Sequence, residues 1–205
     1  TEPEFAGYDN DDIEGAKVDS NVRNGESDES ASVGEDVEVV LDRTPFYAEM
    51  GGQQGDAGKL SAEGVALTVA DTKNHNGLYA HVAHVAEGTL TVGATVTAAL
   101  DAERRGFLRR NHTATHLLDA ALKQVLGEHV SQAGSLVTPE HLRFDFTHFE
   151  ALSSEQLKAV EDLVNQQIFA SKPVVTRVMG IVEAKAAGAV ALFGEKYADV
   201  VRGVC

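Results

Sequence analysis

The sequence predicts an α+β protein, with an antiparallel β-barrel or sandwich in the first half and helices laid on a sheet in the second. Two observations predict this class. From Leu60 to Leu100, short β-branched segments alternate with glycine and asparagine turn signals, as in antiparallel barrels and sandwiches. At Asp101 the apolar period changes from two to about 3.6 residues, the period of an amphipathic helix. The change of pattern therefore falls between residues 100 and 101.

The first forty residues are acidic and poor in large apolar side chains, so we expect loop or hairpin there, followed by a strand at 37–41. The glycine-dense loop at 48–58 lacks the spacing of a phosphate-binding loop, and we interpret it as a tight barrel corner. Later strands of this half are expected at 64–69, 77–82, 89–92 and 94–98. His81 and His84 lie among these strands and are interpreted as structural.

The second half mixes helices and strands. Gly127 should stop the first helix, Pro139 should turn between two strands, and a Ser153–Gln156 capping box should open the second helix. The expected elements are a helix at 111–126, strands at 130–137 and 141–146, a helix from the capping box to Pro173, a strand at 174–178, a short helix at 183–187 and a strand from 200.

Composition indicates an ordinary globular protein. The 205 residues, 43% of them hydrophobic, suffice for one large or two small domains with cores. Cys205 is the single cysteine, which excludes an intrachain disulfide and suits a reducing cytosol, so we expect a cytoplasmic location. We find no targeting segment and no apolar run of membrane-spanning length, so no membrane partner is expected. Because the chain lacks an initial Met, we expect an excised piece of a longer protein.

The net charge of −15 is unevenly distributed. Residues 1–60 hold 16 of the 32 acidic residues and only 4 of the 17 basic ones. Four arginines stand together shortly after the barrel region, namely Arg104, Arg105, Arg109 and Arg110. Since phosphates are held largely by basic side chains, this cluster is compatible with a polyanionic partner, and a solvated start of a helix is the alternative.

His112 and His116 are four residues apart, so both project from one face of the predicted helix, at about 100° per residue. The apolar stripe of the helix lies roughly opposite. This spacing can hold one metal ion. A bare pair of this kind also fits a solvated face or a second layer of packing.

Several segments together resemble one known family. They are Thr44–Gln53, Arg110–His116, Val130–Leu136, Leu142–Phe146 and Ala191–Tyr197. In this order and spacing they resemble the middle of the alanyl-tRNA synthetase family, over nearly the whole chain. The resemblance implies a translation-factor-like β-barrel over 1–100 and a zinc-dependent editing domain over 101–205.

The resemblance also implies site residues. One zinc ion would be bound by His112, His116 and Cys205, and Thr115, Gln132 and Ser135 would line the substrate pocket as its catalytic residues. The chain departs from the family pattern at Cys205, because no Gly-Gly-Thr-His follows it. This leaves the equivalence of Cys205 open and the fourth zinc ligand missing.

The implied activity is proofreading, which is hydrolysis of the aminoacyl ester of Ser-tRNA(Ala) or Gly-tRNA(Ala). A site that accepts alanine cannot strongly exclude glycine or serine, so selection has to be repeated. Thr115 or Gln132 would select serine by pairing with its hydroxyl. The helix lacks the Glu of His-Glu-x-x-His, so the metal itself or another group would activate water.

The expected partners are tRNA(Ala), including its aminoacylated 3′ end, and the rest of a synthetase chain in cis. Nothing in the sequence resembles the domain that uses ATP and magnesium to attach alanine, so we expect no charging of tRNA. Two alternatives stay open, a non-catalytic zinc and tRNA-docking module and a free-standing deacylase acting in trans.

Overall fold

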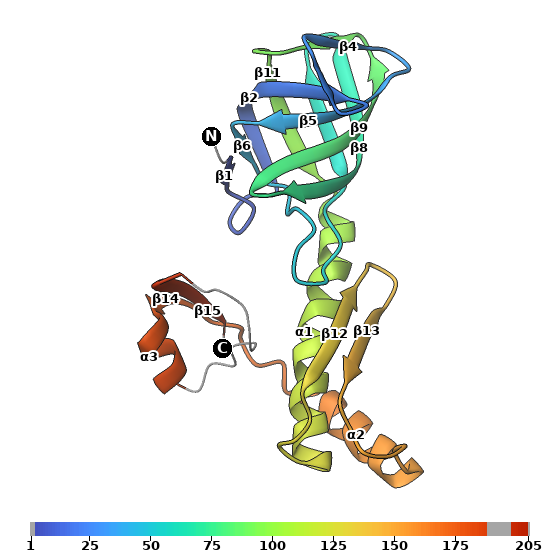
Figure 1. Ribbon diagram of the computed structural model, residues 1–205, viewed down its shortest axis with the longest axis vertical. Coiled ribbons are helices and arrows are strands. Elements are labelled where there is room, and N and C mark those ends of the chain that lie inside the picture. The colour runs from blue at the N-terminus through green and yellow to red at the C-terminus, as the bar shows by residue number, and fades with distance from the viewer. Residues whose placement is uncertain (1–2, 188–197, 205) are drawn as a thin grey trace. The chain divides into compact units, whose positions relative to one another are not determined.

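A computed structural model describes residues 3–187 and 198–204, and the first half of the chain forms a closed antiparallel barrel (Figure 1). Each barrel strand pairs with the next, and the last pairs back with the first. In barrel order the strands are β2 (Asp12–Arg23), β5 (Asp36–Leu41), β9 (Leu78–Glu87), β8 (Val65–His75), β7 (Gly58–Ala62) and β11 (Thr95–Leu100). Closure joins the two outer strands of the barrel sheet to each other, so that neither is a free edge. Of the two predicted architectures, barrel and sandwich, the barrel is confirmed.

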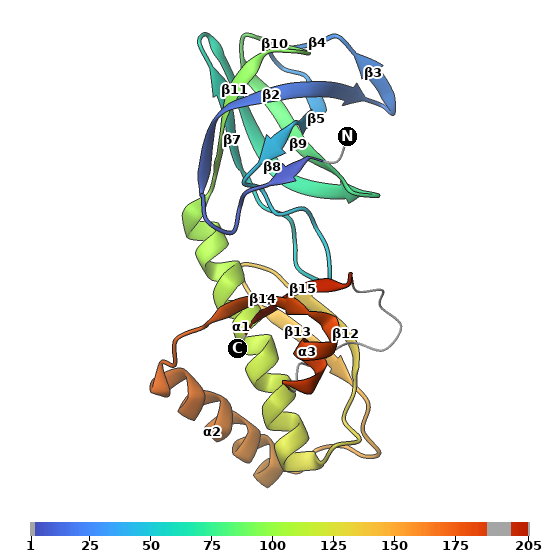
Figure 2. The same ribbon diagram turned by 90° about the vertical axis from the view of Figure 1, so that its left-hand side faces the viewer.

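Five short strands lie beside the barrel strands (Figures 1 and 2). β1 pairs in parallel with β6, β3 forms a hairpin with β2, and β4 pairs antiparallel with β10. Their bounds are Glu4–Phe5 for β1, Glu26–Asp28 for β3, Ser30–Ser32 for β4, Arg43–Thr44 for β6 and Thr89–Thr91 for β10.

Of the two alternatives for this segment, the hairpin is confirmed and the loop is wrong, because β2 is a barrel strand of 12 residues that turns back into β3. Its inward positions carry small apolar side chains, and Ala16 and Val18 are fully buried. The narrow interior of a small barrel needs no larger ones, while the alternate positions can be acidic and face water. A low content of large apolar residues was therefore a poor guide to disorder in this segment.

His81 lies within the barrel core, as its structural interpretation requires. Its side chain is fully buried, with Nδ1 2.8 Å from the Val39 carbonyl oxygen and Nε2 2.7 Å from the Thr44 hydroxyl. Burial lowers the pKa of His81 to about 4, so the ring is neutral in the folded protein. His84 lies on the surface, with Nδ1 2.8 Å from the Asp36 carboxylate.

Helix α1 (Ala102–Leu126) follows the barrel and begins nine residues before its predicted start. The Asp101 side chain caps it by accepting a hydrogen bond of 2.9 Å from the Arg104 N–H. Gly106 does not interrupt the helix, because good helix formers flank it on both sides. The predicted end is confirmed, since the Gly127 N–H donates to the Lys123 carbonyl at 2.9 Å.

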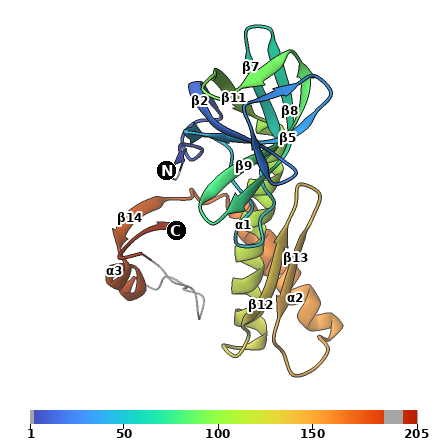
Figure 3. The same cartoon turned by 45° about the horizontal axis from the view of Figure 1, so that its top comes forward.

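The second half places a hairpin beside α1, with β12 (Gln132–Val137) antiparallel to β13 (Leu142–Phe146) (Figures 1 and 3). The capping box is confirmed, because the Ser153 N–H donates to Gln156 Oε1 at 2.8 Å and the Gln156 N–H to Ser153 Oγ at 3.2 Å. It opens helix α2 (Ser154–Ala170). This helix-and-sheet region confirms the predicted α+β class.

The chain forms two compact units, 1–160 and 161–205. In the second unit β14 (Thr176–Gly180) pairs antiparallel with β15 (Val200–Val204), and α3 (Ile181–Ala186) follows β14. The last barrel strand ends at Leu100, where the proposed barrel domain also ends. The division into domains 1–100 and 101–205 stays a proposal. Within residues 3–187 and 198–204, no helix is long and apolar enough to cross a membrane.

Candidate metal and substrate site

The two histidines of α1 lie together as their spacing predicts. Their rings are stacked, with centroids 5.1 Å apart and an interplanar angle of 15°. His116 is exposed, and His112 is partly buried. Burial, and to a lesser extent the neighbouring His116, lowers the pKa of His112. The His112 imidazole is therefore neutral at physiological pH, which is the form that binds a metal ion.

The glycine loop, residues 48–55, does not turn a barrel corner. It leaves the barrel and reaches β12, where Gly52 O accepts from the Val137 N–H at 2.8 Å and the Gln54 N–H donates to Val137 O at 3.0 Å (Figure 1). At Gly52, with φ of 83°, a Cβ would lie 2.4 Å from the Ser135 carbonyl oxygen. The glycine is needed there for close approach to the hairpin, which corrects the barrel-corner interpretation.

Gln53 connects this loop to the histidines. It is 7% exposed, and its Oε1 lies 2.6 Å from His112 Nδ1. An amide oxygen can only accept, so this hydrogen bond requires the tautomer with the proton on His112 Nδ1 and a lone pair on Nε2. Sequence reasoning missed Gln53 because the contact spans 59 residues, and only the density of glycines marked the loop.

The proposed pocket residues differ in exposure. Thr115 is 6% exposed, and its hydroxyl donates to the Asn111 carbonyl of its own helix at 2.9 Å. With its proton engaged in this way, Thr115 Oγ1 can still accept a hydrogen bond from a ligand. The Asn111 amide in turn donates to the Thr138 carbonyl at 2.8 Å, which fixes the turn of the hairpin against α1.

A β-bulge places Gln132 and Ser135 on one face of the hairpin. Gln132 pairs with Phe146 and Ser135 with Phe144, and the register shifts between Gln132 and Gly134. Residues three apart normally face opposite sides of a strand, but the one extra residue of the bulge restores a common face. Both polar side chains therefore share a face with the two stacked phenyl rings, whose centroids are 6.3 Å apart.

The donor set fits zinc in part. Two adjacent imidazoles, one with its second nitrogen held by an acceptor, are typical zinc ligands. Within residues 3–187 and 198–204, no third His, Cys, Asp or Glu joins them to form a metal-binding group. Cys205, the third expected ligand, lies outside the described residues.

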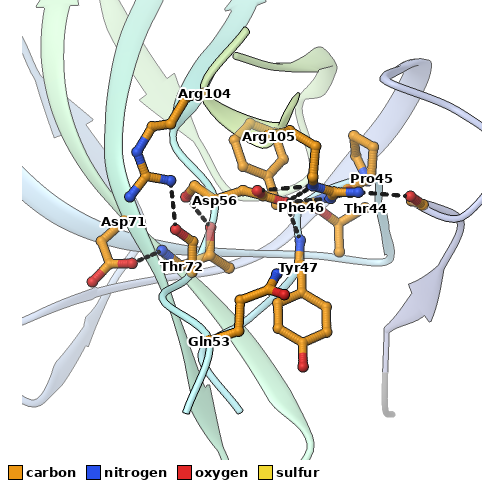
Figure 4. Close-up of polar contacts among 12 residues, drawn as sticks. Thr44, Pro45, Phe46, Tyr47, Gln53, Asp56, Asp71, Thr72, Arg104 and Arg105 are labelled. Atoms are coloured by element: carbon orange, nitrogen blue, oxygen red, sulfur yellow. Dashed lines mark hydrogen bonds and ion pairs between the residues drawn. The ribbon is translucent and has the colours of Figure 1, made fainter. Parts of the chain in front are cut away.

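Arg105 does not face solvent with the other arginines. It is 7% exposed and forms a buried ion pair with Asp56 (Figure 4). Its Nε lies 2.9 Å from Asp56 Oδ1, and its remaining donors reach the carbonyls of Gly7 at 3.0 Å and Pro45 at 3.1 Å. Asp56 Oδ2 also accepts from the Tyr47 N–H at 2.7 Å. Arg105 thus ties the start of α1 to the barrel.

The other three arginines are more accessible. Arg109 and Arg110 are exposed, and the Arg110 guanidinium lies 4.7 Å from the centre of the Phe107 ring. Arg104 is partly buried and donates to the Gly55 carbonyl at 2.8 Å (Figure 4). Arg109 and Arg110 are therefore the members of the cluster best placed to meet a polyanion.

Comparisons with known proteins agree with the resemblance. Residues 1–104 match the family described as tRNA synthetases class II (A). Alanine–tRNA ligases of Pseudomonas entomophila and Sinorhizobium medicae are each 52% identical over 98% of the chain, and that of Acetivibrio thermocellus is 56% identical over 86%. The chain belongs to the alanyl-tRNA synthetase family. It spans 20 to 23% of the length of these relatives.

Four of the five family-like segments meet at this site or support it. Thr44–Gln53 supplies the glycine loop, Arg110–His116 the helical face, and Val130–Leu136 and Leu142–Phe146 the hairpin. Segments far apart in the sequence therefore lie together: the glycine loop contacts His112 through Gln53, and the hairpin packs beside α1 and bonds the loop. The fifth segment, Ala191–Tyr197, lies outside the described residues.

Proposed function

We propose that this chain is the editing part of an alanyl-tRNA synthetase and hydrolyses the aminoacyl ester of tRNA(Ala) mischarged with serine or glycine. The observation that carries the proposal is the stacked His112–His116 pair, with the Nδ1 of His112 held by Gln53. It supports one zinc ion on these histidines, with Cys205 as the proposed third ligand. Bound zinc would supply Lewis acidity to a water or to the ester carbonyl.

Selection of serine would fall to the polar groups beside the histidines. Thr115 already donates its proton to Asn111 O, so it can accept the proton of a serine hydroxyl. Alanine has no hydroxyl and would leave this acceptor, which is only 6% exposed, unpaired. Gln132 and Ser135 would contact the same substrate from the hairpin, because the bulge brings them to one face.

The proposed RNA partner is tRNA(Ala) with its aminoacylated 3′ end. Arg109 and Arg110, with Arg104 behind them, would hold its phosphates without reading the sequence. Arg105 is left out of this set because its guanidinium is committed to Asp56. Attachment of alanine with ATP and magnesium is proposed for the longer ligases that the chain resembles, not for these 205 residues.

The test is single-turnover deacylation of Ser-tRNA(Ala) and Ala-tRNA(Ala), with zinc content measured in parallel. We expect faster hydrolysis of the serine ester, loss of zinc and of hydrolysis in His112→Ala plus His116→Ala, and a narrower Ser/Ala ratio in Thr115→Val. One lost buried hydrogen bond of about 1 to 3 kcal/mol narrows the ratio roughly five- to 150-fold. His75→Ala, on the barrel surface, is the control.

Two outcomes would contradict the proposal. Equal rates on both esters would remove the editing assignment, and an unaltered ester lifetime despite bound tRNA and zinc would favour the docking module. The assay is repeated with a form of the protein that carries the family's Cys-Gly-Gly-Thr-His segment, so that an incomplete ligand set does not mask activity.

A further inference from the structure

Gln53 is the residue of the barrel half that reaches a candidate metal ligand. Its Oε1 lies 2.6 Å from His112 Nδ1, and its side chain is almost fully buried. A neutral imidazole carries one proton, on either nitrogen, and only the other nitrogen can bind a metal. An acceptor held at Nδ1 therefore decides which nitrogen is available.

The loop backbone fixes Gln53 before any metal arrives. The Met50 N–H donates to Gln53 O at 3.3 Å and the Gln53 N–H to Met50 O at 3.1 Å, which closes a tight turn. The residues on either side of Gln53, Gly52 and Gln54, each bond the backbone of Val137 in β12. The Gln53 side chain is consequently aimed at α1 by bonds that do not involve His112.

His112 itself has little freedom to choose another partner. It is part-buried, and the parallel His116 ring stacks on it at 5.1 Å. Within residues 3–187 and 198–204, the His112 ring forms its polar contact with Gln53. Acceptors of this kind, which bind the second nitrogen of a ligand histidine, fix its orientation and typically contribute about ten- to 100-fold to metal affinity.

We propose that Gln53 is a positioning residue for the metal site. It accepts the Nδ1–H of His112 and so holds the ring as the tautomer whose Nε2 can bind zinc. The inference rests on the proposed function for the identity of the metal, but the tautomer it assigns is a property of the metal-free protein. It also gives the glycine loop a role, because the loop carries the acceptor from the barrel to α1.

The first test measures zinc affinity by competition with a chromogenic chelator. Gln53→Met keeps the length of the side chain and removes the amide oxygen, and we expect zinc affinity to fall about ten- to 100-fold. Gln53→Glu keeps an acceptor and should bind zinc at least as well as the wild type. Gln54→Met is the matched control, since it makes the same exchange one residue along the loop and leaves the backbone bond to Val137.

The second test needs no metal. Nitrogen-15 NMR of the imidazole should show His112 protonated at Nδ1 in the wild type and in Gln54→Met, and a shift towards the Nε2-protonated tautomer in Gln53→Met. A wild-type ring protonated at Nε2 would overturn the proposal, as would equal zinc affinity in Gln53→Met and Gln54→Met. If the wild type binds zinc and hydrolyses Ser-tRNA(Ala) while Gln53→Met does so equally well, the proposed function stands and this inference fails.

Discussion

His81 shows how one buried side chain makes the barrel sensitive to acid. In the folded protein its pKa is about 4, while in the unfolded chain it returns to about 6.5. As pH falls through 6.5, His81 becomes protonated in the unfolded chain, whereas in the folded barrel it stays neutral down to about pH 4. The free energy of unfolding should therefore decrease across this window, by about 3 kcal/mol in total from this residue, and level off below it.

The measurement is urea unfolding between pH 7 and pH 4, in the wild type and in His81→Gln. The variant should be less stable at pH 7, because it loses contacts to Val39 and Thr44, but its stability should fall less between pH 6.5 and pH 4. The difference between the two curves isolates His81 from the carboxylates. Parallel curves would show that His81 is protonated without cost in the folded state.

At the scale of elements, the glycine loop depends on one glycine more than on its neighbour. Gly51 and Gly52 both have positive φ, but a Cβ on Gly51 meets nothing within 4 Å, whereas one on Gly52 would lie 2.4 Å from Ser135 O. Gly51→Ala should cost only the backbone strain, about 1 to 2 kcal/mol. Gly52→Ala has the same strain and must also move the loop away from β12.

Hydrogen exchange of the Val137 amide reports this displacement, since that N–H is bonded to Gly52 O. We expect exchange to be faster in Gly52→Ala than in Gly51→Ala by about tenfold or more, equivalent to about 1.4 kcal/mol. Zinc affinity should fall in the same order. Equal exchange rates in the two variants would mean that the close approach to Ser135 is not what holds the loop.

Local signals predicted the elements better than they predicted the site. The capping box at Ser153, the stop at Gly127 and the two strands that turn at Pro139 were predictable because each depends on a few neighbouring residues. The histidine pair was predictable from helical spacing alone. The contact from Gln53 to His112 and the ion pair from Asp56 to Arg105 were not predictable. Each joins residues tens of positions apart, which come together only once the intervening strands have formed the barrel.

At the scale of the whole molecule, charge is separated between an acidic barrel and a few exposed arginines on α1. If Arg109 and Arg110 each meet a phosphate, Arg109→Ala plus Arg110→Ala should weaken tRNA binding. The log–log dependence of affinity on salt should flatten by roughly 1.4 to 1.8. The measurement is tRNA(Ala) affinity at several salt concentrations. Arg23→Ala, which removes a barrel arginine paired with Asp28 and Glu35, should leave the slope unchanged.

An unchanged slope in the double variant would show that these arginines are only a solvated face. Arg105 cannot serve in this test, because its removal would leave the carboxylate of Asp56 buried and unpaired, at a cost of about 3 to 5 kcal/mol. The four arginines are neighbours in the sequence, but their burial differs. Buried Arg105 stabilises the fold, and exposed Arg109 and Arg110 are the ones proposed to bind RNA.

The stretch from Thr44 to Asp56 limits how this protein can be taken apart. Within thirteen residues it bonds the core histidine, carries the acceptor for His112 and supplies the carboxylate that holds Arg105. If α1 and its hairpin were grafted onto another scaffold, they would keep both imidazoles but lose the Gln53 amide that orients the His112 ring. If the chain were cut at the last barrel strand, Gln53 and His112 would lie on different fragments, and their contact would re-form only when the fragments reassociate. Substitutions on the loop and on the helix are therefore coupled, and we expect Gln53 and His112 to covary among related sequences.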